Sequence, residues 1–146
     1  MKSGARARVY YTQHGGYDTH AGQLRPHASL LLELSEALRR FQDNLAASGL
    51  ADRVLVLCFS EFGRRVHENG SGGTDHGTAG PVFLVGKHVR AGLAGETPSL
   101  LDLEDGDLKM AVDFRRIYAA VLQDWLALPA AGALGGRFDP LPVIRT

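Results

Sequence analysis

A long amphipathic helix is encoded between Leu24 and Gly49. Apolar side chains recur there in steps of three and four residues, with charged side chains between them. The apolar stripe consists of Leu24, Leu31, Leu34, Leu38, Phe41 and Leu45. We expect the helix to end at Gly49, because glycine readily adopts the left-handed conformation that closes helices. The stripe predicts a face that packs on a core, rather than a cofactor-binding or membrane helix.

Short apolar segments flank this helix and predict β-strands. Residues 8–12 are rich in aromatic and β-branched side chains, and residues 54–59 form an uninterrupted apolar run. Residues 81–86 form a third segment of strand length. Strand, helix and strand in this order predict a parallel pair joined by a right-handed crossover. The sequence therefore predicts an α/β fold with a mostly parallel sheet.

The remainder of the chain predicts one more helix and a tail. Asp113 is a suitable N-cap for a helix whose buried face would carry Ile117, Val121, Leu122 and Trp125. Residues 129–146 contain three of the six prolines and are expected to run extended over the surface. Because no linker or internal repeat divides the sequence, we expect residues 1–146 to form a single domain.

The composition excludes several classes of partner. Sixteen basic residues balance sixteen acidic ones, so no bulk field would attract nucleic acid or an anionic membrane.

The single cysteine, Cys58, lies in an apolar run and is expected to be a small buried side chain rather than a nucleophile. The basic N-terminus is not followed by an apolar segment that would indicate a signal peptide, and the cellular localisation stays open.

Carboxylates and imidazoles gather in the loops next to the predicted strands. The candidate metal ligands are Asp18 and His20 after the first strand, Glu61 after the second, and Asp75 and His76 before the third. In open parallel sheets, ligands bind beyond the carboxyl ends of the strands, where we expect these loops to meet. Carboxylate and imidazole together suit divalent ions such as zinc or manganese. Arg64 could bind a phosphate or sulfate oxygen through its planar guanidinium.

Simpler roles compete with ligation at these positions. Asp18 or Thr19 could cap the long helix, and a capping residue could still bind a metal ion. Glu61 could form an ion pair with Arg64 or a neighbouring arginine. Ser60 is not surrounded by the residues of a nucleophile elbow, so we interpret it as a hydrogen-bonding neighbour of the site.

Four motifs in order resemble a family of bacterial proteins. Gly15–His20 (GGYDTH) is similar to its GGWDTH motif, and Phe59–Arg64 (FSEFGR) to its SEFGR motif. Gly72–Gly77 (GGTDHG) and Val112–Arg115 (VDFR) resemble two further motifs, and the resemblance covers roughly residues 10–126. The chain thus resembles the C-terminal part of the sulfatase-like domain-of-unknown-function 1501 family, which is placed in the alkaline phosphatase and sulfatase superfamily.

The resemblance implies a three-layer α/β/α fold with a metal site at the carboxyl ends of the strands. It implies that Asp18 and His20 are ligands donated after one strand and that His76 is the late histidine ligand. Glu61 would stand where relatives place an Asp-His or Asp-Asn pair. Asp75 would be either a ligand or a partner that orients His76.

The implied function is hydrolysis of small anionic esters, phosphate or sulfate, with zinc, manganese or calcium as the cofactor. The resemblance places the nucleophile upstream of this chain, so we expect an incomplete site with weak activity or none. We also expect self-association through an uncovered sheet edge. The alternative is a non-catalytic binding or assembly module that retains the fold.

Overall fold

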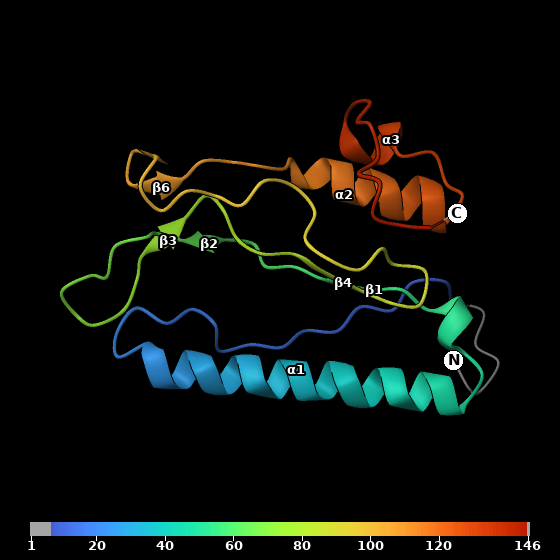
Figure 1. Ribbon diagram of the computed structural model, residues 1–146, viewed down its shortest axis with the longest axis horizontal. Helices are drawn as coiled ribbons and strands as arrows, with labels where there is room; N and C mark the ends of the chain where they lie inside the picture. Colours follow the sequence, from blue (N-terminus) through green and yellow to red (C-terminus); the bar gives the residue numbers. More distant parts are fainter. Residues whose placement is uncertain (1–6, 146) are drawn as a thin grey trace.

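The computed structural model describes residues 7–145, and the basic N-terminal residues 1–6 lie outside it. Its helical elements are α1 (Leu24–Ala47), η1 (Ala51–Arg53), α2 (Phe114–Ala120), the π-helical turn η2 (Val121–Trp125) and α3 (Ala131–Leu134). Its strands are β1 (Val56–Cys58), β2 (Gly63–Arg64), β3 (His76–Gly77), β4 (Phe83–Val85), β5 (Leu103–Glu104) and β6 (Asp107–Leu108). In Figure 1, α1 runs along one side of the molecule, α2 and α3 lie on the other, and β1 and β4 run between them.

The helix predicted from the leucine stripe is α1. It ends as expected, because Gly49 adopts a left-handed φ of 65° and the Leu50 N–H donates to the Leu45 carbonyl. Two i,i+4 ion pairs, Arg39–Asp43 and Arg40–Glu36, lie on its exposed surface. The residue before the helix is Gln23. Asp18 and Thr19 therefore do not cap α1, and their side chains are free for other contacts.

The prediction of a mostly parallel three-layer α/β/α sheet is wrong. Residues 9–12 form no strand, so the predicted first partner is missing from the described chain. β1 pairs antiparallel with β4, with Val56 opposite Val85 and Cys58 opposite Phe83. The other two ladders in residues 7–145 are also short antiparallel pairs. An apolar run indicates burial but not strand direction, and here the β2–β3 hairpin returns the chain alongside β1 in the opposite sense.

The core lies between the β1–β4 pair and α2. Ala119 and Ala120 are fully buried, and these small side chains allow the C-terminal segment to approach α2 closely. The buried members of the core cluster are Ala120, Val143 and Ile144, with Leu55, Leu84, Trp125 and Leu141 packed against them. An isolated antiparallel bridge between Val89 and Ile144 fastens the tail. Among the helices of residues 7–145, none combines the length and the hydropathy that crossing a membrane requires.

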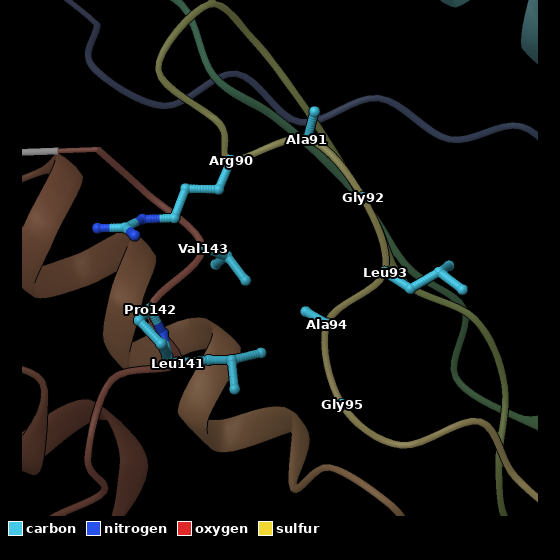
Figure 2. A pocket seen from close by; sticks show the side chains of 9 residues that line it. All are labelled: Arg90, Ala91, Gly92, Leu93, Ala94, Gly95, Leu141, Pro142 and Val143. Carbon is cyan, nitrogen blue, oxygen red and sulfur yellow. The ribbon is translucent and has the colours of Figure 1, made fainter.

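A cavity of about 290 Å³ lies between residues 90–95 and residues 141–143. Figure 2 shows the backbone of residues 90–95 curving opposite Leu141, Pro142 and Val143. Arg90 is the charged residue of this lining, and its backbone N–H donates to the Val143 carbonyl. The cavity is therefore a packing gap beside the C-terminal segment, and the polar residues singled out by the sequence do not line it.

Helix α2 begins as predicted, with Asp113 as its N-cap. The Asp113 carboxylate accepts the Arg115 backbone N–H at 2.9 Å and pairs with the Arg115 guanidinium at 2.6 Å. The hydrogen bond from the Arg115 side chain is the main reason that the pKa of Asp113 lies below its ordinary value, and the backbone hydrogen bond adds to it. The carboxylate form is thus favoured in the folded chain.

Acid should weaken this cap in a way that a substitution can isolate. Because the folded-state pKa of Asp113 is depressed, its stabilisation is complete above the unfolded-state pKa and is lost as pH falls through the folded-state pKa. Asp113→Asn keeps an acceptor for the backbone N–H but has no charge, so its thermal unfolding midpoint should fall less steeply with acid. Circular dichroism melts at a series of pH values test this. An identical pH dependence in the wild type and the variant would contradict it.

Candidate metal centre

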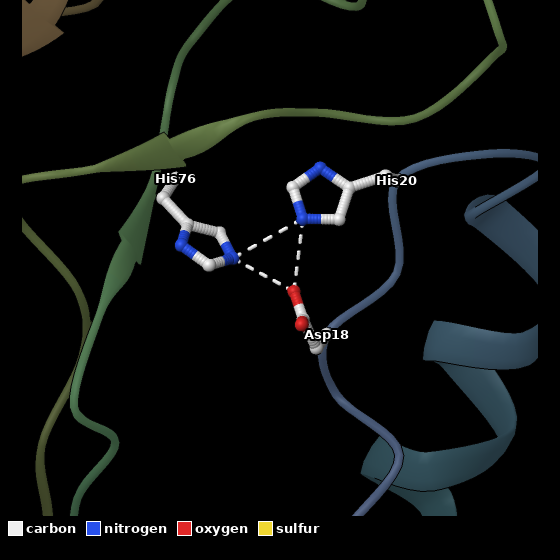
Figure 3. Close-up of side chains that lie close together, drawn as sticks. All are labelled: Asp18, His20 and His76. Carbon is white, nitrogen blue, oxygen red and sulfur yellow. Dashed lines mark hydrogen bonds and ion pairs between the residues drawn. The ribbon is translucent and has the colours of Figure 1, made fainter.

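Three side chains from two distant segments meet at one point. Asp18 and His20 lie in the loop before α1, and His76 opens β3. The Asp18 Oδ1 atom lies 2.7 Å from His76 Nε2 and 2.9 Å from His20 Nε2. The two imidazole Nε2 atoms are 3.2 Å apart. Figure 3 shows the carboxylate and both rings pointing toward one another across the gap between the two segments.

The spacing of these three atoms fits a shared divalent ion. One ligand atom from each residue lies within 4.8 Å of the others. Imidazole and carboxylate ligands lie about 2.0–2.2 Å from zinc, so neighbouring ligands on one ion lie about 2.8 Å apart at octahedral angles and up to about 3.6 Å apart at tetrahedral angles. The separations of 2.9 and 3.2 Å fall in this range, and the separation of 2.7 Å lies just below it. The side chains are 64%, 46% and 45% exposed, in the order Asp18, His20 and His76, so the site is open to a further ligand.

A short hairpin positions His76. β2 pairs with β3 so that Arg64 lies opposite His76 and Gly63 opposite Gly77. The Phe62 ring stacks on the His76 imidazole with centroids 3.8 Å apart and planes 9° from parallel. This contact limits rotation of the imidazole and leaves its Nε2 edge facing Asp18. The β2–β3 pairing fixes where the His76 backbone lies, and the Phe62 ring fixes the plane of the imidazole.

Backbone contacts bring the glycine-rich loop against the loop before α1. The Gly22 N–H donates to the Ser71 carbonyl at 3.0 Å, and the Gln23 N–H to the Gly72 carbonyl at 2.8 Å. A Cβ atom at Gly73 would lie 2.4 Å from the backbone carbonyl of His20, so only glycine allows this approach. The same contacts that dock the two loops therefore set the distance between His20 and His76.

Arg64 also ties these two loops together. Its Nη1 donates to the Thr74 carbonyl and its Nη2 to the Tyr17 carbonyl, both at 2.5 Å. Its guanidinium also lies 5.2 Å from the centre of the Phe62 ring. The sequence predicted an anion-binding role for Arg64, and that role stays a prediction. The geometry assigns two of its donors to positioning the segments that carry Asp18 and His76.

The remaining predicted ligands lie outside the three-residue cluster. Glu61 is exposed and is not part of the group of ligand atoms that converge in residues 7–145. Asp75 lies against His20, with its Oδ1 3.6 Å from Nδ1, the ring nitrogen that faces away from Asp18. The expectation that Asp75 orients His76 is therefore corrected, because its carboxylate is placed beside the other histidine.

Sequence reasoning missed three residues that shape the site. The Asn69 side chain donates a hydrogen bond to the loop that carries His20. The Gln23 side chain bridges Thr19 and Thr74, and the Phe62 ring stacks on His76. The segment Asn69–Gly73 did carry a usable signal, because asparagine followed by glycines is typical of a turn closed by the asparagine side chain. The roles of Gln23 and Phe62 depend on tertiary contacts that no local pattern indicates.

The cluster favours a charged carboxylate. The hydrogen bond with His76 is the main cause that lowers the pKa of the Asp18 carboxyl, and the hydrogen bond with His20 adds to it. The folded-state pKa is therefore below the unfolded-state value, and the stabilisation it represents is lost as pH falls through the folded-state pKa. The site therefore presents a carboxylate anion beside two histidine rings.

Comparison with known proteins gives one result. The family described as Protein of unknown function (DUF1501) matches residues 1–131. None of the curated proteins and none of the solved structures shows a significant match. The matched residues include Asp18, His20 and His76 as well as the hairpin and loops that position them. Since the match spans most of the sequence, the chain belongs to the DUF1501 family.

Proposed function

We propose that Asp18, His20 and His76 bind a divalent metal ion and that the chain is the metal-binding part of a hydrolase acting on phosphate or sulfate esters. The observation that carries the proposal is the convergence of one carboxylate oxygen and two imidazole nitrogens, separated by 2.7–3.2 Å. The ester class rests on the resemblance of the motifs around these residues to those of sulfatase-like proteins of the alkaline phosphatase superfamily.

The ligand chemistry narrows the choice of ion. Two imidazoles with one carboxylate suit zinc, manganese or iron, whereas calcium is bound almost entirely by oxygen atoms. Zinc or manganese is therefore favoured over calcium. When bound, such an ion supplies Lewis-acid stabilisation of an ester oxygen and lowers the pKa of coordinated water. The open, half-exposed face of the cluster leaves room for an ester group beside the ligands.

Ester turnover tests the catalytic part of the proposal. The purified chain, stripped with a chelator and then loaded with zinc or manganese, should hydrolyse aryl phosphate or aryl sulfate slowly. The metal-free chain should be inactive. Turnover should disappear in Asp18→Asn and persist in Glu68→Gln, a matched change at an exposed carboxylate. Turnover that survives both metal removal and Asp18→Asn would reject the proposed site.

A second candidate function, a non-catalytic metal-binding module, is favoured by the hydroxyl groups around the site. Ser60 Oγ donates to the Phe62 carbonyl at 2.7 Å, and Thr74 Oγ1 donates to Gln23 Oε1 at 3.0 Å. Both hydroxyls donate their protons to groups of the loops around the site, as hydroxyls with a structural role do. Tight metal binding with no metal-dependent turnover of either ester class would select this function.

A further inference from the structure

The Asn69 side chain makes four hydrogen bonds at the junction of the two site loops. Its Oδ1 accepts the Ser71 and Gly73 backbone N–H groups at 2.9 and 3.1 Å. Its Nδ2 donates to the His20 carbonyl at 3.0 Å and to Asp75 Oδ1 at 3.2 Å. The orientation of the amide is fixed by this pattern, because only the oxygen can accept two backbone N–H groups. Asn69 therefore closes its own turn with one end and holds two groups of the site with the other.

The groups held by Asn69 both bear on the direction of the His20 ring. The His20 carbonyl fixes the backbone from which the ring projects. The Asp75 carboxylate lies 3.6 Å from Nδ1, while Nε2 of the same ring faces Asp18 and His76. Asp75 thus stands on the side of the ring away from Asp18 and His76, the side from which a carboxylate orients a histidine that binds a metal ion through its other nitrogen.

The geometry points to Asn69 as a positioning residue of the metal site, acting through the His20 backbone and the Asp75 carboxylate. This inference rests on the proposed metal-binding function. It adds a residue outside the set of converging ligands and explains why the turn at 69–73 is held against the loop before α1. Asn69 links the turn, the orienting carboxylate and the ligand-bearing backbone in one side chain.

Asn69→Asp separates the positioning role from the turn. The aspartate keeps an oxygen that accepts the Ser71 and Gly73 N–H groups, but it cannot donate to the His20 carbonyl and it repels Asp75. The added negative charge would by itself attract a cation more strongly, so a loss of affinity would report the displacement of His20 and Asp75 rather than the change in net charge. We expect zinc affinity, measured by calorimetry, to fall roughly 10- to 100-fold, the usual effect of removing a group that orients a ligand.

The control is Asn44→Asp, which makes the same chemical change on the exposed surface of α1. It should leave zinc affinity unchanged, and both variants should melt close to the wild type. The visible absorption of the cobalt-loaded protein gives a second readout, because reorienting His20 alters the bands of the bound ion, whereas loosening a remote turn does not. We expect altered bands in Asn69→Asp and wild-type bands in Asn44→Asp.

The outcomes separate the inference from the proposed function. If the wild type binds neither zinc nor cobalt, both fail. If the wild type binds and Asn69→Asp binds equally well with unchanged cobalt bands, only the positioning role fails. Should Asn69→Asp not fold, Asp75→Asn carries the test, because its amide oxygen still accepts from Asn69 while the charge beside His20 Nδ1 is gone. Wild-type affinity in Asp75→Asn would then overturn the inference.

Discussion

His76→Ala should reduce zinc affinity by more than about 100-fold, the upper limit for groups that only orient a ligand. The substitution removes one of three converging ligand atoms and the Nε2 atom that lies 2.7 Å from Asp18. It also removes the ring on which Phe62 stacks. Two ligands, Asp18 and His20, would remain on one short loop and could hold an ion only loosely. Calorimetric titration of the metal-free chain with zinc measures the effect.

His67→Ala is the matched control, because His67 is an exposed histidine in the segment that follows the β2 strand. It should bind zinc as the wild type does. Asp18→Ala should behave like His76→Ala, since its Oδ1 is the atom shared by both imidazoles. Equal zinc binding by the wild type, His76→Ala and Asp18→Ala would remove the site.

Gly63→Ala should lower the free energy of unfolding by at least about 3 kcal/mol, at or beyond the upper end of ordinary overpacking effects. A Cβ atom at this buried position would lie 1.9 Å from the Ala79 carbonyl oxygen and 2.3 Å from its carbon. Both atoms belong to the backbone and cannot turn aside as a flexible side chain does. The β2–β3 hairpin would have to separate from residues 79–80, and His76 would move with it. Urea denaturation followed by circular dichroism gives the change in stability.

Gly70→Ala is the matched control for Gly63→Ala. Nothing lies within 4 Å of a Cβ atom built at Gly70, and its φ is outside the left-handed region. It should therefore unfold at nearly the wild-type urea concentration. A Gly63→Ala variant as stable as Gly70→Ala would mean that residues 79–80 do not press on the hairpin as described.

Local patterns in the sequence predicted α1 and the start of α2. They missed α3, which lies in the segment 129–146 that was expected to run extended, and they gave the wrong strand pairing. The leucine stripe and Gly49 defined α1, and Asp113 marked the start of α2, because capping and amphipathicity are encoded within a few residues. The strand at residues 54–59 is present as the shorter β1. The predicted partner and direction of this strand were wrong. Pairing direction depends on how the intervening hairpin returns the chain, and an apolar run does not specify that.

The sequence indicated the residues of the candidate site but not the contacts that bring them together. Asp18, His20 and His76 were expected to meet at the rim of a parallel sheet. In the structure they meet because Arg64, Asn69 and two backbone hydrogen bonds dock one loop on another. Ligand-type side chains next to glycines can be read from a sequence. The pairing of the Tyr17 carbonyl with an arginine 47 residues away cannot be read from it.

The cluster joins residues that are 58 positions apart in the chain. An ion held there would act as a reversible cross-link and would close this long loop without a covalent bond. Because only the folded chain presents all three ligands together, occupancy would contribute about 2.7 kcal/mol of folding free energy when free metal exceeds its dissociation constant 100-fold. The concentration of free metal would then set the stability of the folded chain as well as the occupancy of its site.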